Sequence, residues 1–195
     1  VREAGLQERI SLLVVPVVDI QIAKERLRTG DHDGAIELSR AVIDDLFSRA
    51  EMIYRGPPTS ILVEALLRRN NYSGALLEME AAMDLRGSRG QDEALYAWIL
   101  YHQLGSPEEI PSEVWAHIER AFLLDSGCDT AFYYKGMLLK RENRDGEARA
   151  HFRKALRLNP RSLDARRELR VLQMRKRNSE KTDSPSLINR LFKRT

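Results

Sequence analysis

Histidine is the residue type in this chain best suited to metal binding or proton transfer, and its few copies are widely spaced. They are His32, His102, His117 and His151, and no two have the i, i+4 separation of a helical zinc site. On a period of about 34 residues, His117 and His151 fall at the same position of successive helices, where a metal could bridge them. We favour the alternative that they are two partly exposed helix residues.

The chain has a single cysteine, Cys128, between Gly127 and Asp129 at the start of a predicted helix. A helix N-terminus lowers the pKa of a thiol, so Cys128 could be reactive. A small buried turn residue is the interpretation that we favour. One cysteine allows neither an intrachain disulfide nor a cysteine-based zinc cluster.

Residues 86–91, RGSRGQ, combine glycine with arginine and could be compared with a phosphate-binding loop. Their spacing matches neither the P-loop nor the dinucleotide-binding pattern, and no strand is predicted before them. We interpret them as a flexible loop. Asp44 and Asp45 are consecutive, so their carboxylates point apart on a helix. We find no constellation for nucleophilic or acid–base chemistry and therefore expect no catalytic residue, no metal, no cofactor and no enzymatic activity.

The clearest pattern in the sequence is a helix–turn–helix unit over residues 129–162. Small and aromatic residues recur at fixed positions of its two helices, and a proline closes the unit. The positions concerned are Phe132, Gly136, Ala148, Phe152, Ala155 and Pro160. They resemble the tetratricopeptide repeat, a unit of about 34 residues. Lys135 departs from the family's leucine.

The resemblance extends over the chain with decreasing clarity, clearest over 95–162 and divergent over 16–89. It implies an all-α, right-handed solenoid of antiparallel helical hairpins with a C-terminal capping helix. We expect hairpins at about 16–55, 56–89, 95–128 and 129–162, a cap over 162–177, and one repeat domain over 16–177. Residues 1–15 are predicted to form a short N-terminal segment with a helix, and residues 178–195 a flexible basic tail.

The composition is typical of a globular domain, because 43% of the 195 residues are hydrophobic and 31% are charged. Residues 161–195 carry 11 Lys/Arg against 4 Asp/Glu, whereas residues 1–160 carry 21 against 25. An acidic body with a basic tail favours an interaction arm over a nucleic-acid-binding domain. The longest apolar run, residues 10–18, is too short to span a bilayer and lacks the features of a signal peptide. The single cysteine, which allows no intrachain disulfide, fits a reducing cytoplasm.

In this family the concave face is lined by the first helix of each hairpin, and it binds an extended peptide or a partner helix. The residues expected there are Tyr96, Ile99, Gln103, Tyr133, Met137, Lys140 and Arg141. Apolar and aromatic anchors would supply affinity, and Lys140 and Arg141 orientation. The alternative is that some of these residues pack against the neighbouring hairpin. The carboxylate clamp of some family members, made of lysine, asparagine and arginine, is not reproduced.

The tail ends in an apolar-basic segment whose Leu187, Ile188, Leu191 and Phe192 would share one side of a short helix. Such a segment is too short to be helical alone. It could dock on a partner protein, contact an anionic membrane surface weakly, or fold back on the solenoid. We leave these alternatives open.

We therefore expect a non-enzymatic scaffold or adaptor that binds another protein. Residues 20–69 resemble repeat regions of bacterial signalling enzymes, and residues 92–195 resemble repeat tails of bacterial regulatory proteins, which favours a bacterial protein. The start at Val1 is typical of a fragment, so the repeats could instead regulate a catalytic domain before them. A self-assembling module that forms a homodimer or larger species is a further alternative. The mosaic of resemblances also leaves open a recombined chain.

Overall fold

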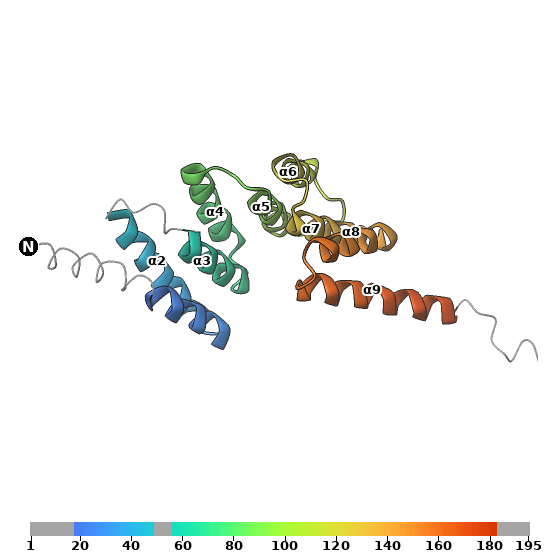
Figure 1. Cartoon of the computed structure of the whole chain (residues 1–195), viewed down its shortest axis with the longest axis horizontal. Coiled ribbons are helices and arrows are strands. Elements are labelled where there is room, and N and C mark those ends of the chain that lie inside the picture. Colours follow the sequence, from blue (N-terminus) through green and yellow to red (C-terminus); the bar gives the residue numbers. More distant parts are fainter. Residues whose placement is uncertain (1–17, 49–55, 183–195) are drawn as a thin grey trace, which may run out of the picture.

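The computed structural model describes residues 18–48 and 56–182, and over these residues it consists of helices without a strand. A helix over 18–29 comes first. The others are α2 (His32–Ser48), α3 (Gly56–Arg68), α4 (Tyr72–Arg86), α5 (Gly90–Gln103), α6 (Ser112–Leu124), α7 (Asp129–Arg141), α8 (Asp145–Leu158) and α9 (Leu163–Thr182). Figure 1 shows them arranged side by side along one elongated molecule. The predicted all-α solenoid is confirmed.

The turns that follow α3, α5 and α7 share one backbone feature, a residue in the left-handed conformation. Asn70 and Asn143 have positive φ angles of 55° and 60°, and Gly105 has a φ of 80°. Glycine and asparagine tolerate this left-handed conformation better than other residues, so they end the first helix of a hairpin cleanly. Asn71 then caps α4, because its side chain accepts a hydrogen bond of 3.0 Å from the backbone N–H of Gly74.

Successive hairpins are joined through the sides of their helices. Helix α4 packs against both α3 and α5, α5 packs against α7, and α8 packs against α9. Apolar residues at these contacts form several local core clusters along the stack. One of them combines Leu62, Val63 and Leu66 of α3 with Met79 of α4 and Ile99 of α5. The core is therefore a row of local clusters, as expected for a repeat protein.

Small residues set the closest helix contacts. At Gly136 of α7, a Cβ atom would lie 2.8 Å from Cε1 of Phe152, which is fully buried in α8. At Gly90 of α5, a Cβ atom would lie 2.8 Å from the backbone oxygen of Ala121 in α6. Glycine is thus required at both positions by space rather than by backbone conformation.

Three boundaries differ from those expected. Helix α5 begins at Gly90 rather than near residue 95, and the predicted loop over 86–91 shrinks to residues 87–89. The first helix of this hairpin lies further upstream because the following loop is long and is anchored by the buried Ile110. Helix α9 continues to Thr182 rather than ending at residue 177. Segments 1–17, 49–55 and 183–195 lie outside the described residues.

Candidate functional site

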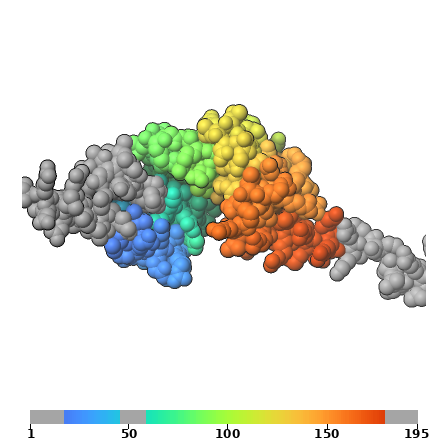
Figure 2. Space-filling model, in the orientation of Figure 1, coloured from blue at the N-terminus to red at the C-terminus, as the bar shows by residue number. Residues whose placement is uncertain are grey.

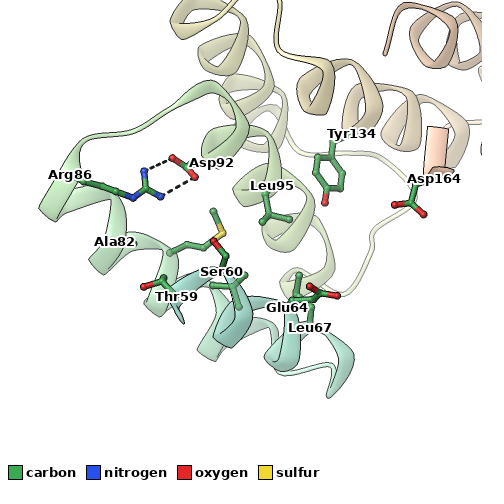
Figure 3. Close-up of a pocket in the computed structure, with 12 residues that line it drawn as sticks. Thr59, Ser60, Glu64, Leu67, Ala82, Arg86, Asp92, Leu95, Tyr134 and Asp164 are labelled. Carbon is green, nitrogen blue, oxygen red and sulfur yellow. Dashed lines mark hydrogen bonds and ion pairs between the residues drawn. The ribbon is translucent and has the colours of Figure 1, made fainter. Parts of the chain in front are cut away.

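A pocket of about 430 Å³ opens on the side of the molecule formed by the first helices of the hairpins. In Figure 2 the surface is indented between the teal helix α3 and the orange C-terminal helices. Figure 3 shows side chains of α3, α4 and α5 around the pocket, with α7 and the start of α9 at one end. The lining residues are Thr59, Ser60, Val63, Glu64, Leu67, Met79, Ala82, Arg86, Asp92, Leu95, Tyr134 and Asp164.

Apolar side chains make up the floor of this pocket. Val63 and Met79 are buried and belong to the core cluster shared by α3, α4 and α5, while Leu67 and Leu95 pack on its edge. Because the floor is continuous with the core, it is held in place whether or not the pocket is occupied. Seven of the twelve lining residues are polar or charged, so the apolar floor is surrounded by a largely polar rim.

Tyr134 supplies an unusual polar group to this pocket. Its ring packs face-on against Trp98 of α5, with centroids 5.9 Å apart, and edge-on against Tyr133. Its hydroxyl group is directed towards the pocket (Figure 3) and has no hydrogen-bond partner among the described residues. Burial raises the pKa of Tyr134 well above its usual range, and nearby negative groups, Asp164 and Glu64 among them, add to this effect.

The two carboxylates on this part of the rim differ in their surroundings. Glu64 forms an ion pair of 2.7 Å with Arg68, one helical turn further along α3. Asp164, in the first turn of α9, makes no ion pair with any described residue. Both carboxylates are exposed to solvent. The pocket therefore presents negative charge and hydrogen-bond acceptors at its α9 end.

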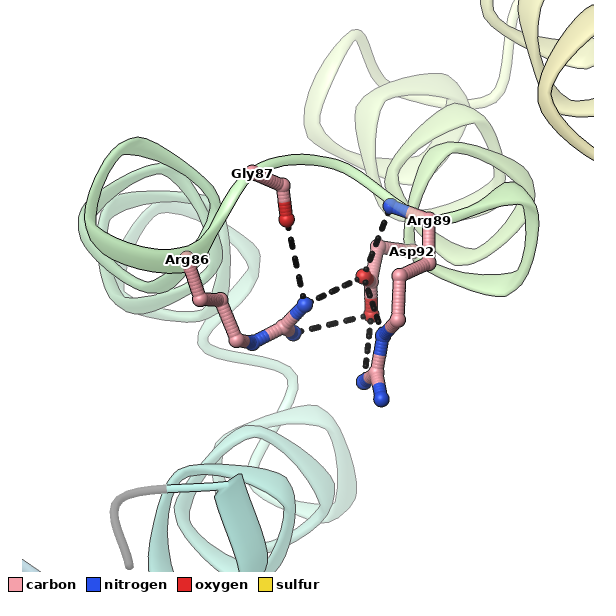
Figure 4. A network of polar contacts seen from close by, with 4 residues as sticks. All are labelled: Arg86, Gly87, Arg89 and Asp92. Carbon is pink, nitrogen blue, oxygen red and sulfur yellow. Dashed lines mark hydrogen bonds and ion pairs between the residues drawn. The ribbon is translucent and has the colours of Figure 1, made fainter. Parts of the chain in front are cut away.

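At the opposite wall, Asp92 is enclosed by two arginines (Figure 4). Its carboxylate accepts hydrogen bonds of 2.7 and 3.0 Å from Arg86, and of 3.0 and 3.3 Å from Arg89. It also accepts one of 3.1 Å from the backbone N–H of Arg89, which caps α5. Burial opposes ionisation of Asp92, but the two guanidinium groups outweigh it and lower the pKa. We call this network the Asp92 clip.

The Asp92 clip accounts for the glycine- and arginine-rich sequence between α4 and α5. Arg86 and Arg89 are both held by one carboxylate, and Gly90 is needed for the contact with α6. Their side chains thus stabilise the junction of two hairpins rather than forming an open phosphate cradle.

Most of the residues expected to bind a partner on α7 are engaged in packing. Tyr133 and Met137 pack against the core cluster that contains Phe152 and Leu172 of α9. Lys140 forms an ion pair with Glu168 of α9. The cap helix therefore lies over this stretch of the concave face. Arg141 remains exposed at the end of α7.

The residues expected on α5 have other surroundings. Ile99 is fully buried between α3, α4 and α5, so its assignment as a partner contact is corrected to the core. Tyr96 donates a hydrogen bond of 2.5 Å to Glu80, and burial and this bond raise its pKa to about 12. Gln103 is exposed and accepts a hydrogen bond of 3.0 Å from Ser73. Leu187, Ile188, Leu191 and Phe192 of the tail lie outside the described residues.

Histidine and cysteine form no metal centre in the part of the chain that the structure describes, since it contains no group of three or more metal-ligating side chains. His117 instead contacts the buried Glu93, with 2.7 Å between Nδ1 and Oε2. Cys128 is buried at the N-cap of α7, where its Sγ accepts a hydrogen bond of 3.4 Å from the N–H of Ala131. Burial raises the pKa of this thiol despite the adjacent helix N-terminus.

The sequence analysis missed the pocket residues Glu64, Leu95, Tyr134 and Asp164. A fixed step of about 34 residues, which matches Trp98 with Phe132, is valid only if every hairpin has the same loop length. The turn residues offer a better register, because Gly105 and Asn143 have the same left-handed conformation after α5 and α7. Aligning the chain on these turns places Leu95 at the position of Tyr133.

Comparison with known proteins agrees with the helical arrangement. The family model of the tetratricopeptide repeat matches residues 130–162. A thermophilic TPR protein of Thermus thermophilus is 19% identical, with a TM-score of 0.62 over 82% of this chain and 81% of that chain. MamA of Desulfovibrio magneticus RS-1 is 15% identical, with a TM-score of 0.53 over 85% and 88% of the two chains.

A tetratricopeptide repeat protein of Parabacteroides merdae ATCC 43184 is 18% identical, with a TM-score of 0.53 over 85% of this chain and 61% of that chain. The search among curated proteins returned no match. At these identities the similarity establishes the fold. Among the described helices, none combines the length and the apolar character needed to cross a membrane.

Proposed function

We propose that this tetratricopeptide-repeat chain is a non-enzymatic scaffold or adaptor that binds a peptide or helix of another protein on its concave face. Proteins of this fold are generally protein-interaction scaffolds. The observation that carries the proposal is the pocket between α3, α4 and α5, with its apolar floor and polar rim. We also propose that the protein is bacterial and that it is located in the cytoplasm.

The shape of the site favours an extended ligand. A second pocket of about 500 Å³ adjoins the first and shares Ser60 and Glu64 with it. It continues along α3 to the helix over 18–29, where Leu27 and Ile61 supply apolar surface. Together the two pockets form a groove across the first helices, and a peptide could place successive side chains in it. We call this the concave groove.

Within the proposal, the residues in contact with the partner are those of the concave groove, together with the exposed Gln103 and Arg141. Tyr133, Met137 and Lys140 act mainly through α9, which they hold against α7. Tyr96 supports the junction of α4 and α5 through Glu80. The groove, rather than the α7 surface, is thus the part of the concave face that is open to a ligand.

The test uses two adjacent residues of α4. Ala82 lines the pocket, whereas Ala81 is exposed and does not. Random peptides displayed on phage are selected on the full chain, and the affinity of synthetic versions is then measured for the wild type, Ala82→Trp and Ala81→Trp. We expect Ala82→Trp to weaken binding by about tenfold or more because the indole fills the pocket, and Ala81→Trp to leave it unchanged.

Thermal unfolding of both tryptophan variants serves as the control for folding. Equal binding by a folded Ala82→Trp variant, or failure of the selection to enrich any peptide, would count against a peptide-binding groove. Light scattering of the wild type then distinguishes self-assembly, since a concentration-dependent dimer would point to a second copy as the partner.

A further inference from the structure

We propose that the pocket recognises a basic side chain of the partner, a lysine or an arginine, next to a large apolar side chain, through Asp164, Glu64 and the hydroxyl group of Tyr134. This inference rests on the proposed function for the location of the ligand. It adds the chemical class of the ligand, which the fold alone does not specify.

The hydrogen-bonding capacity at the α9 end of the pocket carries the argument. The carboxylates of Asp164 and Glu64 are acceptors only, and the hydroxyl group of Tyr134 can accept as well as donate. Ammonium and guanidinium groups are donors only. A cationic side chain therefore matches all three groups, with Asp164 as the carboxylate that has no ion pair among the described residues and Glu64 shared with Arg68, whereas a carboxylate or phosphate of a ligand would be repelled by both carboxylates.

Tyr134 is the observation that distinguishes this site from an ordinary exposed acidic cluster. The Tyr134 side chain is partly buried, and its hydroxyl group makes no hydrogen bond to the described residues, so its hydrogen-bonding capacity is left for water or a ligand. Its aromatic contacts with Trp98 and Tyr133 hold the ring in place, so it cannot easily turn away. A hydrogen bond from a ligand would satisfy the hydroxyl group.

The other charged groups around the pocket leave the α9 end negative. Arg86 and Arg89 are held by Asp92, and Arg68 is held by Glu64. No described residue forms an ion pair with Asp164, which leaves its charge for a ligand. In the adjoining pocket the basic residues are Lys24, Arg28 and Arg68; Arg28 and Arg68 are paired with Glu25 and Glu64, so Lys24 is the one that would repel a basic residue. The charge distribution thus directs the basic residue of a ligand to the α9 end.

The apolar floor of the pocket is the reason for expecting a large apolar side chain next to the basic side chain of the ligand. The methylene groups of lysine and arginine pack on apolar surface while the charged end reaches a polar rim. Leu67 and Leu95 lie beside the acidic rim and could take this stem, and the floor formed by Val63 and Met79 leaves room for an apolar neighbour. Burial of that neighbour would supply most of the affinity, and the cation would supply selectivity.

The test uses the peptides selected on the full chain. We expect the enriched sequences to share a lysine or arginine beside a large apolar residue. Replacing that basic residue with glutamine should weaken binding by about tenfold. In the protein, Asp164→Asn and Glu64→Gln should each weaken binding by about threefold, and together by about tenfold, because both carboxylates are exposed. High salt should weaken binding by the wild type more than by the double variant.

Tyr134→Phe gives an independent readout, since its hydroxyl group makes no hydrogen bond to the described residues. The substitution should weaken binding of the basic peptides several-fold while leaving the melting temperature unchanged or higher. Glu109→Gln is the matched control, because it removes one negative charge from an exposed loop residue that does not line the pocket. It should leave binding unchanged.

The outcomes separate this inference from the proposed function. If peptides bind and Ala82→Trp abolishes binding, but the peptides lack a basic residue or tolerate the Asp164, Glu64 and Tyr134 variants, the groove assignment stands and the cation assignment is wrong. If Ala82→Trp has no effect, or no peptide binds, the groove assignment fails and the cation assignment fails with it.

Discussion

At the scale of single residues, the fold depends most visibly on Gly136. Its α-carbon lies so close to the buried ring of Phe152 that a Cβ atom would be 2.8 Å from the nearest ring atom. We expect Gly136→Ala to lower the free energy of unfolding by about 1–3 kcal/mol, because the ring must move within a packed core. This cost exceeds the gain of up to about 1 kcal/mol from the better helix propensity of alanine. Denaturant unfolding measures the difference.

Gly146 provides the matched control for this substitution. It lies in the first turn of α8, where a Cβ atom would meet no other heavy atom within 4 Å. Gly146→Ala should therefore stabilise the protein by up to about 1 kcal/mol. A Gly136→Ala variant that is as stable as Gly146→Ala would show that Phe152 is not fixed by its surroundings.

These two glycines also show what the sequence can and cannot predict about single residues. The close contact at Gly136 was predictable, because a small residue there and an aromatic residue at Phe152 are part of the repeat pattern. Ile99 was harder to place, because an apolar side chain on a first helix fits both the groove and the core. Its burial depends on the path of α3, which is not encoded near Ile99 in the sequence.

At the scale of elements, the junction between α4 and α5 depends on the Asp92 clip. One carboxylate ties the end of α4 to the start of α5 and caps α5. We expect Asp92→Asn to lower the free energy of unfolding by about 1–3 kcal/mol, because two arginines then lose their charged acceptor. Asp84→Asn, on the exposed side of the neighbouring helix α4, should change it by no more than about 0.5 kcal/mol.

The dependence of this effect on pH follows from the lowered pKa of Asp92. A carboxyl group with a lower pKa in the folded state stabilises the protein fully above its unfolded pKa of about 3.9. That stabilisation is lost as the pH falls below this value towards the pKa of the folded state. The stability difference between wild type and Asp92→Asn should thus be constant near neutral pH and shrink in acid. A difference that persists unchanged in acid would exclude the charge as its cause.

The position of α5 illustrates why element boundaries were harder to predict than element type. Helical periodicity and the repeat pattern predicted helices here, but the fixed period placed the first helix too far downstream. The start at Gly90 is set by three-dimensional contacts, namely the clip at Asp92 and the approach of Gly90 to Ala121. The clip joins residues three and six positions apart, but the approach of Gly90 to Ala121 joins residues far apart in the sequence and has no local signature.

At the scale of the whole molecule, the main helix contacts among the described residues lie within hairpins or between neighbouring hairpins, so the end of the stack needs a capping helix. Helix α9 covers the last hairpin and places Leu172 in a cluster with Leu139, Ala148 and Phe152. Its apolar side was predictable from the sequence, since Leu169 and Leu172 recur at helical spacing. That it would also cover Tyr133 and Met137, and bring Asp164 to the pocket, required the packing of the helices.

Leu172→Ala tests this view of the molecule as a row of local contacts. Removing a fully buried leucine should lower stability by about 2–5 kcal/mol, whereas Met174→Ala, at a side chain that is 51% exposed, should have little effect. Because the clusters are local, amide hydrogen exchange should speed up in α7, α8 and α9 and remain nearly unchanged in α2 and α3. Equal acceleration in all helices would instead mean that the stack unfolds as one cooperative unit, in which case a ligand bound between α3 and α9 would stabilise every hairpin equally.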